Sequence, residues 1–154
     1  MKNKINIGLF CDAFYPMIDG VISVVDNYAR NLIKKANVIV FVPECKTKFD
    51  DSIFPYKIVR VKSIKIARLD YVLPLPYIDN KFLKELEYYK LDIIHVHSPA
   101  TLGITGIKYA KKNNIPVVAT MHSQYKQDFK NYTHSKILTR IGTKYIASFF
   151  NKCD

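Results

Sequence analysis

Residues 91–120 read LDIIHVHSPATLGITGIKYAKKNNIPVVAT, and their pattern is the clearest indication of the fold. The segment Asp-Ile-Ile-His-Val-His, residues 92–97, predicts a buried strand. A helix is predicted over about 100–113, where two glycines allow close packing on a sheet, and another apolar strand follows over 115–120. A strand, a helix and a second strand within about 30 residues are typical of the βαβ unit of a parallel sheet.

The rest of the chain continues this alternation. Further strands are predicted over 4–10, 37–42 and 56–61. Further helices are predicted over 21–33 and about 135–150, and another could begin after Asp79, which could cap it. Segment 62–78 has no clear periodicity, and a loop is predicted from 121 to about 132. Apolar strands that alternate with helices indicate an α/β fold: a Rossmann-like, doubly wound parallel sheet covered on both faces.

The composition is that of one ordinary globular domain. The chain has 154 residues, of which 49% are hydrophobic and 24% charged, and a domain of this size can bury a core without disulfides. Its three cysteines match no zinc or disulfide spacing, so reduced thiols in a cytoplasmic protein are the simplest interpretation. No apolar stretch reaches the length needed to cross a bilayer.

The chain carries a formal net charge of +11, mostly from lysine. Two interpretations stay open: an anionic partner, or an AT-rich coding bias that also favours Asn, Ile and Tyr. Nine basic residues and one acidic residue lie between 108 and 152. In the last predicted helix, Lys136, Arg140 and Lys144 follow i, i+4, i+8 spacing beside an apolar face. That helix could lie on an anionic membrane, or pack on the sheet with its lysines in solvent.

Ligands of open parallel sheets bind outside the carboxyl ends of the strands. Three segments should meet at that edge: the loop 11–20, the strand end 95–99 and the strand end 120–123. The loop leads into a helix N-terminus at Gly20 and Val21, where free N–H groups could receive a phosphate, although Gly20 could equally serve a tight turn. No Gly-x-Gly-x-x-Gly or Walker sequence is present, which disfavours dinucleotide and P-loop binding.

The strand ends carry three histidines. His95 and His97 share one face of their strand, where one of them could be a hydrogen-bonded core residue. A His-x-His pair can also bind a metal, but no cysteine or acidic ligand accompanies this one, so we expect no metal site. His122 ends the next strand, where its neutral ring could orient a hydroxyl group, or could be a structural histidine.

Two of these segments in order resemble the N-terminal domain of family 4 retaining glycosyltransferases. INIGLFCDAFYPMIDGVISVVDNYARNL, residues 5–32, is similar to the family's first strand, its Asp-x-x-x-Pro-x-x-Gly-Gly-Val loop and the helix that follows. LDIIHVHSPATLGITGIKYAKKNNIPVVATMHSQY, residues 91–125, resembles its paired strand ends. The resemblance implies the GT-B architecture of two Rossmann-like domains, with residues 1–154 as the acceptor-side domain. It also implies transfer of a sugar from a nucleotide-sugar with retention at the anomeric carbon.

The resemblance assigns roles to individual residues. His122 would be the cleft histidine that contacts the acceptor or the transferred sugar. The acceptor side would be formed by Asp12, Pro16, His97, Thr120 and Ser123.

The donor diphosphate would approach the loop of Asp19, Gly20 and Val21. Asp19 stands where many members have the first of two glycines, so this loop should be less permissive than theirs.

The family's nucleotide-sugar site lies mainly on a C-terminal domain, and its Arg/Lys pair and Glu-x7-Glu motif cannot be located here. We therefore expect a truncated acceptor-binding half that is inactive alone and needs a donor domain as partner. Its substrates would be a nucleotide-sugar and a sugar, glycan or glycolipid acceptor, with no cofactor and no nucleic acid. The alternatives are a stand-alone binding module or a subunit of a split transferase. A flavodoxin-like domain would leave the strand-end histidines unexplained.

A lipid acceptor is suggested by the basic C-terminal third and by the Lys/Arg-rich, aliphatic segment 57–76. These features lead us to expect a cytoplasmic protein that can rest on the inner face of the membrane as a peripheral protein.

Overall fold

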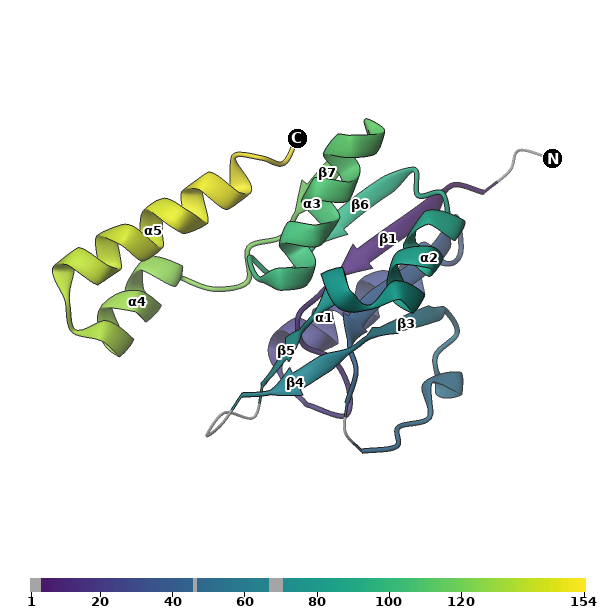
Figure 1. Cartoon of the computed structure of the whole chain (residues 1–154), viewed down its shortest axis with the longest axis horizontal. Coiled ribbons are helices and arrows are strands. Elements are labelled where there is room, and N and C mark those ends of the chain that lie inside the picture. Colours follow the sequence, from purple (N-terminus) through teal and green to yellow (C-terminus); the bar gives the residue numbers. More distant parts are fainter. Residues whose placement is uncertain (1–3, 46, 67–70) are drawn as a thin grey trace.

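A five-stranded parallel sheet forms the centre of the computed structural model, which describes residues 4–45, 47–66 and 71–154 (Figure 1). The strand order is β3-β2-β1-β6-β7, and every neighbouring pair is parallel. The strands are β1 Asn6–Phe10, β2 Asn37–Pro43, β3 Lys57–Val61, β6 Ile93–Val96 and β7 Val117–Ala119. The strand order reverses between β1 and β6, so the predicted doubly wound, Rossmann-like sheet is confirmed.

Helices cover both faces of this sheet. The helix α1 (Gly20–Leu32) packs with one core cluster, and α2 (Asn80–Tyr88) and α3 (Thr101–Asn113) pack with the other. Successive side chains of a strand point to opposite faces. Leu9 accordingly belongs to the α1 cluster, and its neighbour Phe10 belongs to the α2 and α3 cluster.

The helix ends follow the local sequence. Asp79 caps α2 as predicted, because its carboxylate accepts a hydrogen bond from the N–H of Phe82 at 3.1 Å. Its other oxygen accepts from the N–H of Lys62 at 2.8 Å, so one buried carboxylate also fixes the end of β3. Asn114 ends α3 in the left-handed conformation, with φ 55°, which asparagine tolerates better than most residues.

Two segments between the predicted elements have structure that the sequence did not predict. Segment 44–55 contains a short 3-10 helix, η1 (Asp51–Ile53). Segment 62–78 forms an antiparallel hairpin, β4 (Ser63–Lys65) with β5 (Val72–Pro74), followed by η2 (Pro76–Ile78). Residues 67–70 of the predicted basic segment 57–76 lie outside the described residues.

The loop predicted over 121–132 is wrong, because Tyr125–Thr133 forms the helix α4. This helix buries none of its side chains, so it lacks the apolar stripe by which a helix is recognised in a sequence. It packs against α5 (Lys136–Phe150), the predicted last helix, and the two lie together at one side of the sheet (Figure 1). Gly142 allows this contact, since a Cβ there would lie 2.7 Å from the ring of Phe129.

The helix α5 joins the core only near its C-terminal end. Ile146 and Phe149 are buried, whereas Ile137, Leu138 and Ile141 are more than half exposed. Packing on the sheet, one of the two roles left open for this helix, therefore applies to its C-terminal end alone.

At Gly103, α3 lies in close contact with the preceding turn. A Cβ at Gly103 would lie 1.9 Å from the backbone oxygen of Ser98. The backbone can relieve this overlap only by a shift that costs more free energy than moving a flexible side chain. We expect Gly103→Ala to lower the free energy of unfolding by about 3 kcal/mol or more, because the added carbon overlaps the chain. Chemical denaturation measures this change.

Gly20→Ala is the matched control, because a Cβ at Gly20 meets nothing within 4 Å and no glycine in the described chain has a positive φ. It should stay within about 1 kcal/mol of the wild type. Equal losses in the two variants would contradict the proposed close contact at Gly103.

Candidate functional site

The carboxyl ends of β1 and β6 are joined through the carboxylate of Asp12. Its Oδ2 accepts the hydroxyl hydrogen of Ser98 at 2.6 Å, and its Oδ1 accepts that of Thr101 at 2.7 Å and the N–H of Leu102 at 2.8 Å. The N–H of Asp12 donates back to Ser98 Oγ at 2.9 Å. Asp12 therefore serves as the anionic cap of α3, which has no capping side chain of its own. Contact of Asp12 with an acceptor stays a prediction.

The predicted donor loop lies at the N-terminus of α1. Asp19 caps this helix, because its Oδ1 accepts from the N–H of Ile22 at 2.9 Å. Gly20 begins the helix and is exposed with open space beside its Cα, while Val21 packs partly against the core. The backbone at Gly20 is thus accessible, but the Asp19 carboxylate already takes one of the free N–H groups. The phosphate role of this loop stays a prediction.

The three histidines are brought together by the pairing of β6 with β7. His95 Nε2 lies 2.8 Å from Thr120 Oγ1, and His97 Nδ1 lies 3.1 Å from His122 Nε2. The rings of His95 and His97 are 4.0 Å apart, and Tyr28 of α1 packs against both. His97 is 1% exposed, while His122 is partly open to solvent.

Burial keeps these imidazoles neutral. Desolvation lowers the pKa of His95 to about 4 and that of His97 to about 2, with smaller contributions from the neighbouring histidines. Desolvation also lowers the pKa of His122, although the Asp19 carboxylate opposes this shift. At neutral pH each ring therefore carries one proton, and a hydrogen bond between two rings needs one donor and one acceptor.

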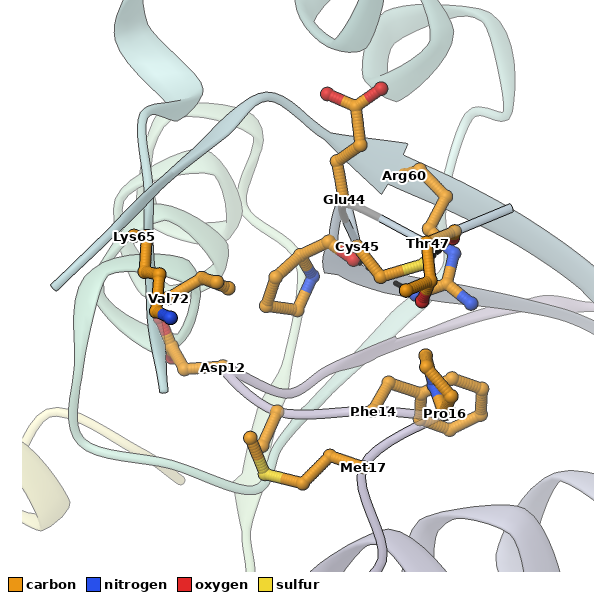
Figure 2. A pocket seen from close by; sticks show the side chains of 12 residues that line it. Asp12, Phe14, Pro16, Met17, Glu44, Cys45, Thr47, Arg60, Lys65 and Val72 are labelled. Carbon is orange, nitrogen blue, oxygen red and sulfur yellow. Dashed lines mark hydrogen bonds between the residues drawn. The ribbon is translucent and has the colours of Figure 1, made fainter. Parts of the chain in front are cut away.

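A cavity of about 350 Å³ opens outside the carboxyl ends of β1, β2 and β3 (Figure 2). Two predicted acceptor residues, Asp12 and Pro16, line it. Its remaining walls are the residues Ala13, Phe14, Met17, Pro43, Glu44, Cys45, Thr47, Arg60, Lys65 and Val72. The cavity combines apolar side chains with two cations, Arg60 and Lys65, and two carboxylates, Asp12 and Glu44, and this mixture suits an amphipathic ligand.

Sequence reasoning missed Arg60, although a charged residue inside the apolar strand 57–61 was a usable signal. Its guanidinium binds both oxygens of Asp51, at 3.0 and 2.7 Å, and the carbonyl of Pro43 at 2.9 Å. These bonds hold Arg60 in the cavity wall. Lys65, from the unassigned segment, has no carboxylate within ion-pair distance among the described residues.

The structure divides the predicted acceptor residues into separate groups. Asp12 and Pro16 line the cavity, whereas Thr120 and His97 belong to the histidine cluster. Ser123 lines a different hollow, between the end of β7 and the α4–α5 pair. Within the described ranges, no group of three or more His, Cys, Asp or Glu side chains could hold a metal ion.

Replacing Asp12 should weaken the β1–α3 junction. Asp12→Asn removes the negative charge on which two hydroxyls and two N–H groups converge, and we expect a loss of about 1–3 kcal/mol in the free energy of unfolding. Asp50→Asn is the control, because Asp50 caps only the exposed helix η1. Chemical denaturation should show a clear shift for Asp12→Asn and little for Asp50→Asn. An unchanged midpoint for Asp12→Asn would contradict its role as a cap.

Comparison with known proteins agrees with this geometry. Residues 18–154 match the family model described as Glycosyltransferase Family 4. An alpha-monoglucosyldiacylglycerol synthase of Acholeplasma laidlawii is 35% identical over 141 residues, covering 87% of this chain and 33% of the relative. An alpha-monoglucosyldiacylglycerol synthase of Streptococcus pneumoniae is 31% identical over 156 residues, covering 94% of this chain and 32% of the relative. A GDP-mannose-dependent alpha-mannosyltransferase of Corynebacterium glutamicum is 27% identical over 159 residues, covering 96% of this chain and 36% of the relative.

The chain thus spans about a third of the length of the curated relatives it matches. The family model covers most of this chain. The chain's first strand, its loop and its paired strand ends resemble the same family. This chain belongs to glycosyltransferase family 4, as a domain of the N-terminal type.

Proposed function

We propose that this domain is the acceptor-binding side of a retaining glycosyltransferase that transfers a sugar from a nucleotide-sugar to a lipid. A second domain would hold most of the nucleotide-sugar. Family membership supports the transfer chemistry. The names of two relatives, both alpha-monoglucosyldiacylglycerol synthases, support a diacylglycerol-type acceptor.

The cavity at the carboxyl edge is the observation that carries this proposal. Phe14, Met17 and Val72 offer an apolar wall to the glycerol and first methylene groups of a lipid. Lys65 faces the same space in Figure 2 and could hold a polar headgroup oxygen. A cavity of about 350 Å³ is too small for two acyl chains, so the chains would stay in the membrane.

The α4–α5 pair supports docking on that membrane. Ile137, Leu138 and Ile141 of α5 are 72%, 52% and 59% exposed. The cations of this pair are Lys126, Lys130, Lys136, Arg140 and Lys144. None of them forms a salt bridge with any carboxylate that the structure describes.

Exposed aliphatic side chains beside unpaired cations are the features of a helix that lies in an anionic interface. Each such cation contributes about 1 kcal/mol near an anionic surface. Among the described residues, no helix is long and apolar enough to cross a bilayer.

Vesicle flotation tests the membrane surface. We expect the chain to float with vesicles that contain anionic lipid and to remain behind with zwitterionic ones. Changing Lys126, Lys130, Lys136 and Arg140 to Gln should weaken binding to the anionic vesicles by about a hundredfold or more, because four attractive charges are lost.

The matched control changes Lys34, Lys35, Lys57 and Lys84 to Gln. It removes the same charge from the turn after α1, from β3 and from α2, and should bind nearly as well as the wild type. Equal recovery on both kinds of vesicle, or equal losses in both variants, would refute the proposed surface.

The acceptor side alone should not catalyse transfer, because stabilisation of the leaving diphosphate dominates this chemistry and its residues would lie on the second domain. Purified chain, incubated with GDP-mannose or a glucose nucleotide and diacylglycerol vesicles, should form no glycolipid above a protein-free blank. Glycolipid formed in proportion to the wild-type chain, and lost in His122→Ala, would contradict this division of labour.

A further inference from the structure

His97 holds the one unsatisfied buried polar atom among the described side chains. Its ring is 1% exposed, and its Nε2 has no hydrogen-bond partner. The residue itself is firmly placed, since its backbone N–H donates to the oxygen of Phe10 at 2.9 Å. Its ring lies between those of His95 and His122, at 4.0 and 5.3 Å between centroids.

The contact between His97 Nδ1 and His122 Nε2, at 3.1 Å, needs one proton. In one arrangement the proton is on His97, so His97 Nε2 is a bare lone pair and His122 carries its own proton on Nδ1. In the other, His122 Nε2 donates, so His97 carries its proton on Nε2 and His122 Nδ1 is bare. Both rings are neutral at neutral pH, because burial lowers the pKa of each.

The surroundings of His97 distinguish the two arrangements. The second would leave an N–H buried with no nitrogen or oxygen acceptor, and orphaned buried N–H groups are rarer than under-satisfied acceptors. The ring of Tyr28, 5.6 Å away and tilted by 53°, offers only a weak π acceptor. The first arrangement avoids the orphaned donor.

We propose that His97 is a positioning residue that donates from Nδ1 and thereby fixes His122 as its Nδ1–H tautomer. His122 Nδ1 makes no hydrogen bond within the described chain and is not among its buried unsatisfied atoms, so it reaches solvent. His122 then offers a bound ligand an N–H donor and has no free lone pair with which to act as a base. Only the identity of that ligand, a sugar or acceptor oxygen, rests on the proposed function.

Neighbouring contacts keep this donor in place. The bond between His95 and Thr120 at 2.8 Å ties the end of β7 to β6. The N–H of Thr120 also donates to the oxygen of Val96 at 3.0 Å. His122, two residues further on, is therefore held within reach of His97.

Nitrogen-15 NMR of the full chain tests the proposal, since long-range proton–nitrogen correlations distinguish protonated from bare ring nitrogens. At neutral pH we expect His97 and His122 both to be protonated at Nδ1. His134, exposed at the end of α4, is the internal reference for a ring that exchanges freely between tautomers. A His122 protonated at Nε2, or averaged like His134, would overturn the proposal from the wild-type spectrum alone.

Two variants separate positioning from packing. His97→Leu fills the site without a donor, so His122 should average between tautomers as His134 does. His97→Asn places an amide N–H near the position of Nδ1 and should restore the Nδ1–H form. An unchanged His122 tautomer in His97→Leu would overturn the proposal. None of these spectra involves lipid or nucleotide-sugar, so their outcome is independent of the proposed function.

Discussion

The carboxylate of Asp12 is the interaction on which the carboxyl edge of this domain depends. Four donors converge on its two oxygens, and they come from the turn after β6 and the first turn of α3. Asp12 itself follows β1, so this one side chain joins the two strands between which the sheet order reverses. A negative charge at a helix N-terminus is favourable, and the junction ties the loop after β1, which borders the cavity, to the turn after β6.

The rest of the edge is built from contacts of the same kind, in which polar groups are satisfied locally. Gly103 lets α3 approach Ser98 closely enough for that turn to form. Between the carboxyl ends of β6 and β7, the described polar side-chain contacts are made by buried neutral histidines, with no carboxylate among them. Their lowered pKa values mean that hydrogen-bond direction, more than charge, determines what His122 can offer a ligand. The two halves of the edge thus present different chemistry: an apolar cavity with charged groups of both signs, and a neutral donor.

Sequence periodicity predicted the sheet because its strands are buried on both faces and its main helices have an apolar stripe. It failed at α4, which buries no side chain, and at the hairpin of β4 and β5, which is too short to show a period. At the site, the sequence allowed the prediction that the strand ends meet. It did not allow a prediction of which atoms form hydrogen bonds there. Asp12 and Ser98 are 86 positions apart in the sequence. No local pattern predicts their contact, or the register that sets His97 beside His122.

Amide chemical-shift mapping can show whether the carboxyl-edge cavity receives a lipid acceptor. Labelled chain would be compared in bicelles with and without diacylglycerol, so that shifts common to both report membrane contact alone. Shifts specific to diacylglycerol should cluster at Phe14, Met17 and Val72 in the cavity wall. Diacylglycerol-specific shifts confined to the amino edge of the sheet, near Asn37 and Lys57, or absent altogether, would contradict the claim.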